Sequence, residues 1–311
     1  MNLKWKKKGL VYSPKYDGGW MDNSALTPTA FLLNKDVIRV YAGFRDTNGI
    51  SRIGYVDVSS DNPSMILKVS EQPVLDVGEP GMFDDNGVIL GDIINVGEEI
   101  RMYYVGFQLV KKAKFLAYTG LAVSNDGGDN FDRISPTPIL DRTQEGKFIR
   151  AIHSVLVEDG VFKVWYATGN GWETINNTDY PQYDINYIES RDGISFPSSG
   201  NKIIKNNLKN KEYRIGRPRV HRFGENYLIN FTYGTTDGRY EAGQAISSDG
   251  VNWIRDDKGI GITVSQEGWD SKHLSYPSLI TVPNGKTYMF YNGNDMGREG
   301  FGYAELVEGA L

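Results

Sequence analysis

The chain has 311 residues, of which 40% are hydrophobic, and carries a formal net charge of −5. This length is enough to bury a large core, and the acidic balance argues against nonspecific nucleic-acid binding as the main role. The sequence has no cysteine, which excludes disulfides, thiolate catalysis and cysteine-based metal sites, and only three histidines.

No apolar run approaches the roughly 18 residues that a transmembrane helix requires. The first residues, MNLKWKKKGLVYS, are basic but lack the apolar stretch of a signal peptide. We therefore expect a soluble, cytoplasmic protein that needs no metal or other cofactor and does not bind nucleic acid.

In chain order, the sequence is a succession of short β-strands, because runs rich in Tyr, Val and Ile are separated by Gly, Asn and Asp. Five strands rich in aromatic residues end near a glycine: VIRVYAGF (37–44), EIRMYYVGF (99–107), VFKVWYATG (161–169), NYLINFTYG (226–234) and TYMFYNG (287–293). One aromatic residue marks the same position in each, namely Tyr41, Tyr104, Tyr166, Phe231 and Tyr291. The markers lie 63, 62, 65 and 60 residues apart, so the chain contains five copies of an internal repeat.

Further strands surround each marker strand. One strand precedes it, another follows it, and in three copies an Asp-Gly hairpin turn comes next, at Asp126, Asp192 and Asp249. Four strands per repeat predict an all-β fold, a five-bladed β-propeller that forms one domain over residues 1–311. A pair of β-sandwiches is the alternative, but it would not explain five evenly spaced copies.

The last repeat stops at Leu311, before its fourth strand. The N-terminal KWKKKGLVYS resembles the missing piece, with Trp5 in the place that other repeats give to Phe131, Phe196 and Trp253. We therefore expect residues 1–12 to complete the last blade.

The first strand of each blade borders the central channel of a propeller, so the starts of these strands are the expected ligand site. Aligning them gives Thr27-Pro28, Asp85-Asn86, Ile152-His153, Arg217-Pro218 and Tyr276-Pro277. Because residues two apart share a strand face, the expected channel face contains Asp85, Arg150, Arg217, Arg219 and Tyr276, with Thr27, Thr29 and Ser154. Asp84 points the other way. We expect it to accept hydrogen bonds from a neighbouring loop or an arginine, and we keep it among the candidate binding residues.

One carboxylate among three arginines indicates an anion-binding site, because a guanidinium binds phosphate or carboxylate through two parallel hydrogen bonds. The alternative is that these arginines neutralise carboxylates between the blades. Two cations on one face, in GRPRV, favour the functional interpretation, because they are costly to bury unless neutralised.

The five-blade pattern, the strand starts and WMDNS resemble the glycosidase-like five-bladed propellers, which include arabinanases, invertases, levansucrases and β-mannoside phosphorylases. The segments RVYAGFRDTNGISRIGYVDV, GMFDDNGV and EGWDSKHLSYPSL are more similar still to uncharacterised glycosidase-like proteins found in bacterial surface-polysaccharide gene clusters. The resemblance covers essentially the whole chain.

The resemblance implies a glycosidase-like enzyme in polysaccharide biosynthesis. Its hydrolases place carboxylates on the first three blades, which here implies Asp85 on the second, Asp22 near the first and Glu173 near the third, where Ile152 stands at the aligned position. Its phosphorylases imply Asp85 as the general acid and Arg150, Arg217, Arg219 and His273 as ligands of an anion. A glycosyl phosphate, a nucleotide sugar or an acidic sugar would fit the same arginines.

Loop residues complete the candidate site. Trp20, Trp172 and Trp269 lie in loops flanked by Gly or Asp and could stack on sugars, or could instead cover the blade ends. Asp270 follows Trp269, and Arg45 could frame the site or form a surface ion pair. The sequence thus predicts a carbohydrate-active enzyme that cleaves or transfers a glycosyl group; a catalytically silent sugar-binding propeller or a scaffold is the alternative.

Overall fold

The computed structural model describes residues 3–309, which form antiparallel strand units with little helix. The first unit contains β2 (Asn23–Asn34), β3 (Val37–Arg45), β4 (Ser51–Ser59) and β5 (Ile66–Val69). The next contains β6 (Val88–Val96), β7 (Glu99–Gln108), β8 (Leu116–Ser124) and β9 (Asp132–Arg133). It is followed by β10 (Ile149–Glu158), β11 (Val161–Ile175), β12 (Thr178–Ser190) and β13 (Asn201–Ile204).

The C-terminal part continues the pattern with β14 (Glu212–Phe223), β15 (Asn226–Thr235), β16 (Tyr240–Ser247) and β17 (Ile254–Arg255). The last strands are β18 (Ser275–Thr281), β19 (Thr287–Asn292) and β20 (Phe301–Glu308). The helices in the described range are short: η1 (Leu208–Asn210), η2 (Asp257–Ile260) and α1 (Asn294–Gly297). Hydrogen bonds connect the strands of residues 3–309 into two four-stranded sheets and one twelve-stranded sheet.

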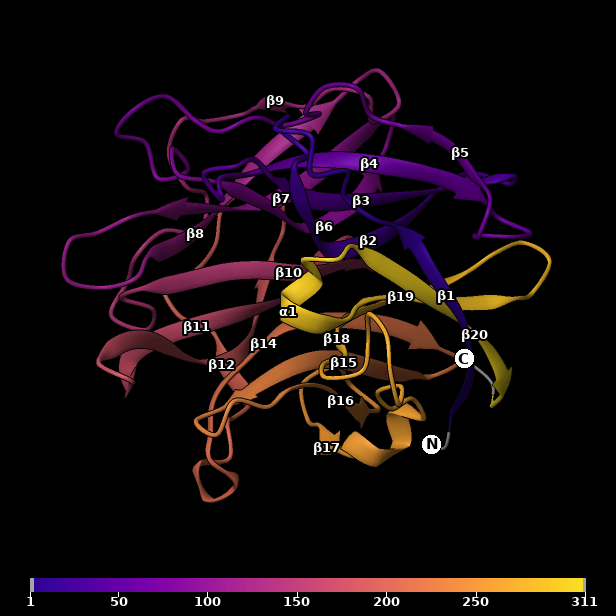
Figure 1. The fold of residues 1–311 in the computed structure, drawn as a ribbon. Helices are drawn as coiled ribbons and strands as arrows, with labels where there is room; N and C mark the ends of the chain where they lie inside the picture. Colours follow the sequence, from indigo (N-terminus) through magenta and orange to yellow (C-terminus); the bar gives the residue numbers. More distant parts are fainter. Residues whose placement is uncertain (1–2, 310–311) are drawn as a thin grey trace.

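The N-terminal strand β1 (Lys4–Tyr12) completes the last unit, because it pairs antiparallel with β20. Figure 1 shows this contact as the indigo strand beside the yellow one. Trp5 is buried and its indole Nε1 donates to the carbonyl of Ile260 at 2.8 Å. The predicted pairing of the N-terminal segment with the last repeat is therefore confirmed, and residues 1 and 2 of that segment lie outside the described range.

The first strands of successive units contact one another in a closed cycle, in which β2 meets β6, β6 meets β10, β10 meets β14, β14 meets β18 and β18 meets β2. We call these strands the hub. Hydroxyl groups link neighbours along it: Ser154 accepts from the amide of Val220, and Ser278 accepts from the amide of Ala30.

The hub strands share a break in register, and this break corrects the sequence alignment. In the second unit it falls between Leu90 and Asp92, whereas Asp85 lies in a turn before β6 begins at Val88. The equivalent of the Xaa-Pro starts is therefore five residues later than we expected. Gly91 stands there because a Cβ would lie 2.2 Å from the carbonyl oxygen of Ile152.

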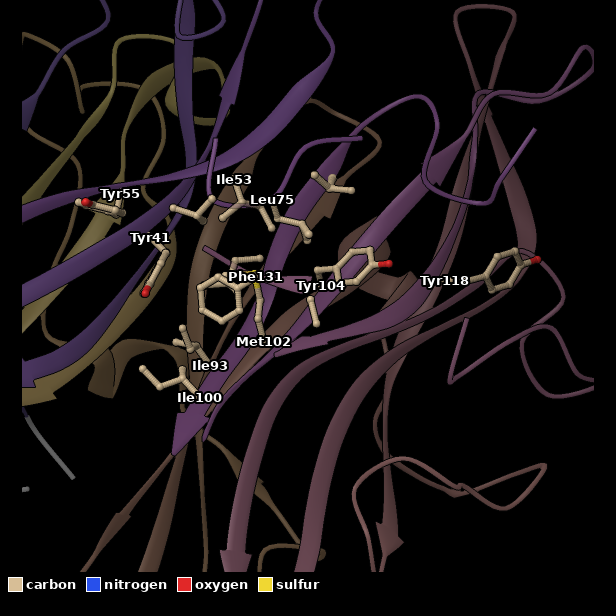
Figure 2. Packing of buried hydrophobic residues seen from close by; sticks show 14 of the residues in the cluster. Tyr41, Ile53, Tyr55, Leu75, Ile93, Ile100, Met102, Tyr104, Tyr118 and Phe131 are labelled. Atoms are coloured by element: carbon tan, nitrogen blue, oxygen red, sulfur yellow. The ribbon is translucent and has the colours of Figure 1, made fainter. Parts of the chain in front are cut away.

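Aromatic residues fill the space between units. Figure 2 shows one such cluster, in which Tyr41 and Ile53 of the first unit pack with Met102, Tyr104 and Phe131 of the second. In two units a glycine of the following strand makes room for the marker ring. A Cβ at Gly120 would lie 2.2 Å from the ring of Tyr104, and one at Gly243 would lie 2.4 Å from that of Phe231.

Candidate functional site

Arg217 lies at the centre of the hub and binds neutral groups of three other strands. Its guanidinium donates to the carbonyl of Leu90 on β6 and lies 3.0 Å from Nδ1 of His153 on β10. It also donates to the hydroxyl of Thr29 at 2.9 Å and to the carbonyl of Thr27 at 3.2 Å, both on β2. Burial, with the nearby charge of Arg219, lowers the pKa of Arg217 to about 9, so it remains protonated at neutral pH and cross-links the hub.

Arg219 has a carboxylate partner that we did not expect. It forms an ion pair with Asp92, and the side chains of the two residues are only 10% and 5% exposed. The other carboxylate oxygen of Asp92 accepts from the amide of Val155 at 2.6 Å. Arg219 is therefore neutralised within the protein, as the bracing alternative proposed for these arginines.

Arg150 and Asp84 also have partners within the fold. The guanidinium of Arg150 donates to the carbonyl of Asp141 at 3.0 Å and lies 3.4 Å from the carboxylate of Glu145. Asp84 is buried and accepts from Arg133 at 2.8 Å. Because these contacts occupy their charged groups, we leave Arg150, Arg219 and Asp84 out of the candidate site.

A second group of charged and aromatic side chains lies near the N-terminal ends of the hub strands. We call Arg45, Arg214, Tyr183, Tyr240 and Tyr276 the arginine–tyrosine cluster. The hydroxyls of Tyr240 and Tyr276 are 2.7 Å apart. The guanidinium carbon of Arg214 lies 4.7 Å from the centre of the Tyr240 ring. Arg45 is the last residue of β3. Burial lowers its pKa, and its guanidinium lies near enough to Tyr276 for ionisation of that hydroxyl to oppose this lowering.

Two glycines leave space for side chains of this cluster. Gly216 leaves space for the ring of Tyr183, because a Cβ there would lie 2.6 Å from it. Gly234 does the same for Arg214, whose Nε would lie 2.5 Å from such a Cβ. The backbone thus sets where the ring and the guanidinium lie.

The two guanidinium groups of the cluster have no counter-ion. Within residues 3–309, the side chains of Arg45 and Arg214 form no ion pair or hydrogen bond, and each has a buried Nε without a partner. Burial lowers the pKa of Arg45, but an arginine remains charged at neutral pH. Both side chains are half-buried. Such cations are costly unless paired, and an anion that accepts hydrogen bonds from them would offset that cost.

Two of the predicted catalytic carboxylates lie on segments next to the strand end that carries Arg45. Asp22 directly precedes Asn23, which pairs with Arg45 across the sheet. Arg45 also pairs with Ser51, whose hydroxyl donates to the carbonyl of Val88, three residues after Asp85.

Neither carboxylate is neutralised by a cation in the described part of the chain. Asp85 accepts from the amide of Gly81 at 2.8 Å and from the side chain of Asn86. The carboxylate of Asp22 accepts a hydrogen bond from the backbone amide of Gly18 at 2.7 Å and one from the side-chain Nδ2 of Asn23 at 3.3 Å. Both are half-buried, so part of each side chain is open to solvent.

The third predicted carboxylate, Glu173, lies on the long hairpin of β11 and β12 (Figure 1). It accepts from the side-chain amide of Gln182 at 2.8 Å. Trp172, the residue before it, packs against Phe148 with ring centres 4.6 Å apart. The hairpin thus supplies an aromatic surface, and Trp172 is half-buried rather than enclosed.

The remaining loop residues pack inside the units. Trp20 packs edge-on against Phe44 and donates to the carbonyl of Glu71, and Trp269 stacks on Tyr291. Asp270 is buried and forms an ion pair with Lys7 at 2.7 Å. We therefore leave Trp20, Trp269 and Asp270 out of the site.

His273 is half-buried at the edge of the cluster, with its ring 6.5 Å from that of Tyr240. Its Nδ1 accepts from the amide of Asp295 at 3.3 Å.

Sequence reasoning missed Arg214, Tyr183, Tyr240 and Asp92. Strict alternation from Arg217 places Arg214 on the opposite face, but β14 has a register shift between Gly216 and Arg219, and such a bulge breaks alternation. Asp92 did carry a signal, because a lone carboxylate in the apolar run ILGDIINV needs a buried partner.

Two features of residues 3–309 bear on function. These residues contain no group of three or more His, Cys, Asp or Glu side chains that could hold a metal ion. Nor does this range include a helix with the length and apolar character needed to cross a bilayer.

Solved structures with the same fold include proteins described as glycoside hydrolases. One described as "Glycoside hydrolase" has a TM-score of 0.74 at 18% identity, over 99% of this chain and 93% of its own. A structure from work on the GH130 family of mannoside phosphorylases has a TM-score of 0.70 at 15% identity, over 98% of this chain and 94% of its own. A thermostable family-43 glycoside hydrolase has a TM-score of 0.67 at 15% identity, over 95% and 91%.

The chain therefore has the fold of the glycosidase-like propeller superfamily, as the sequence resemblance predicted. No family model matches it. The uncharacterized protein Rv1502 of Mycobacterium tuberculosis is 31% identical over 304 residues, which cover 98% of this chain and 99% of the relative. Protein MT1551 of a second strain of that organism matches to the same extent. The chain belongs to the family of these mycobacterial proteins.

Proposed function

We propose that the chain is a single-domain, five-bladed propeller that binds an anionic carbohydrate at the arginine–tyrosine cluster and cleaves or transfers its glycosyl group. The observation that carries this proposal is the pair of half-buried guanidinium groups, of Arg45 and Arg214, without any counter-ion in the described chain. A carboxylate or phosphate on the sugar would supply the missing charge.

The tyrosines of the cluster suit a sugar because they combine an aromatic face with a hydroxyl. Burial raises the pKa of both Tyr240 and Tyr276. Their hydroxyls are therefore protonated at neutral pH. One donates to the other across the 2.7 Å contact, and the remaining proton can be donated to a ligand oxygen. This chemistry and the glycosidase-like fold together favour a sugar over a simple inorganic anion.

Asp85 is the proposed general acid, which protonates the oxygen of the bond that is cleaved. Asp22 is the proposed second carboxylate, because it lies on the other side of the strand end of Arg45. Water or phosphate would then accept the glycosyl group, as in hydrolases and phosphorylases respectively. A role in polysaccharide biosynthesis, which the sequence resemblance implies, remains part of the proposal, as does a cytoplasmic location.

Calorimetric titration with galacturonate, galactose 1-phosphate and galactose tests the binding site. We expect the wild-type protein to prefer at least one of the two anionic sugars to galactose. Arg214→Met and Arg45→Met should each weaken that binding about tenfold or more, because each removes a charge-assisted hydrogen bond. Arg191→Met is the control, because Arg191 is exposed and has no partner among the described residues. Equal binding of all three sugars, or unchanged affinity in both variants, would refute the proposed site.

A catalytically silent sugar-binding protein is the second candidate. It is favoured by the hub, where Thr27, Leu90 and Ile152 stand at the aligned starts to which the resemblance assigns three carboxylates. Asp85→Asn separates the two functions on a panel of nitrophenyl glycosides and glycosyl phosphates. For an enzyme, kcat should fall about 100-fold or more while ligand affinity is kept. Asp159→Asn, in an exposed turn between β10 and β11, should change neither, and a wild-type protein without turnover on the panel would favour the silent alternative.

A further inference from the structure

A series of ring and cation contacts leads from the arginine–tyrosine cluster, through the buried ring of Tyr213, to the exposed Lys114. The guanidinium carbon of Arg214 lies 5.0 Å from the centre of the Tyr213 ring. The Tyr213 ring is 6.4 Å from that of Tyr180 on the long hairpin, and the ammonium group of Lys114 lies 4.6 Å from the centre of Tyr180. We call Arg214, Tyr213, Tyr180 and Lys114 the outer path.

The outer path crosses three units, because Arg214 is on β14, Tyr180 is on β12 and Lys114 precedes β8. Its outer end is strongly basic. Lys111, Lys112 and Lys114 are all exposed, and none of them forms an ion pair with a described residue. This basic segment is a local exception in a chain whose net charge is −5.

The carboxylates of the hairpin do not neutralise these lysines. Glu173, which pairs with Tyr180 across the hairpin, accepts from Gln182. Asp179 accepts from the hydroxyl of Thr174 at 2.6 Å. Lys114 is therefore held over an aromatic ring, with its positive charge available to a ligand.

Apolar rings lie beside the path. Phe107 and Phe115 pack edge-on with centres 5.2 Å apart, and Phe115, Phe148 and Tyr183 belong to one packed cluster. All four rings are half-buried. Cations next to partly exposed aromatic faces match the chemistry of a sugar chain that carries a carboxylate on successive residues.

We infer that the ligand is an acidic oligosaccharide, with one anionic residue at Arg45 and Arg214 and a further anionic residue at Lys114. This inference rests on the proposed function, since it extends the same site outward. A single sugar phosphate would occupy only the cluster and leave Lys114 without a role.

The test compares galacturonate with tetragalacturonate, by titration of the full chain at two salt concentrations. The tetramer should bind at least about tenfold more tightly than the monomer, and more so at low salt, because exposed charges are screened by salt. Lys114→Ala should weaken tetramer binding about threefold to tenfold and leave monomer binding unchanged. Lys258→Ala, an exposed lysine on η2, is the control and should change neither.

The outcomes separate the two proposals. If Arg214→Met weakens neither ligand, the proposed binding site itself is wrong. If Arg214→Met weakens both, but the tetramer binds no better than the monomer or Lys114→Ala has no effect on it, the outer path is overturned and the inner site stands.

Discussion

Asp92→Asn tests whether the hub depends on its buried ion pair. The substitution keeps the size of the side chain and an acceptor for the amide of Val155, but it removes the negative charge beside Arg219. Two buried cations, Arg217 and Arg219, then remain at the centre of the hub. Breaking one partner of a buried pair costs about 3–5 kcal/mol, because the other charge is left uncompensated.

Urea unfolding followed by tryptophan fluorescence measures this cost. With a slope on the order of 3 kcal/mol per molar urea for a chain of this size, the midpoint should fall by about 1–1.7 M. The double variant Asp92→Asn with Arg219→Met should recover much of the loss, because no unpaired charge from the pair remains. A midpoint within 0.3 M of wild type (roughly 1 kcal/mol at that slope), or a double variant as unstable as the sum of the single ones, would refute the reasoning.

Three other predictions concern stability. Burial, with the charges of Arg217 and Arg219, lowers the pKa of His153 in the folded protein well below its usual range. Below pH 6.5 the unfolded chain binds a proton at this histidine and the folded protein does not, so the folded state loses stability as the pH falls. Between pH 7.5 and 5.5 the free energy of unfolding should drop by about 1.4 kcal/mol more in wild type than in His153→Asn; parallel pH profiles would contradict this. Gly91→Ala should cost about 2–4 kcal/mol in urea unfolding, since its Cβ would collide with the backbone of β10, and an unchanged midpoint would show that the hub strands can separate. Trp5→Ala should cost about 3–5 kcal/mol, because Trp5 is buried and bonded to Ile260; a loss below about 1 kcal/mol would mean that β1 contributes little.

The sequence determined the features of the fold that repeat. The aromatic markers predicted which strands are equivalent from one repeat to the next. The structure adds that in two repeats the marker ring fills space left by a glycine of the next strand, as Tyr104 does at Gly120. The same repeat predicted the pairing of the N-terminal strand with the last unit. These predictions succeeded because strand formation depends on local residue patterns, and the same pattern recurs in each repeat.

Only the tertiary structure shows which arginine side chains have a carboxylate partner. Arg150, Arg219, Arg214 and Arg45 are alike in sequence, yet Glu145 and Asp92 neutralise the first two, whereas the last two have no counter-ion in the described chain. The partner of Arg219 is 127 residues away. Such pairing depends on how the hub strands meet in space, and the bulges there break the alternation from which a side chain's direction could be predicted.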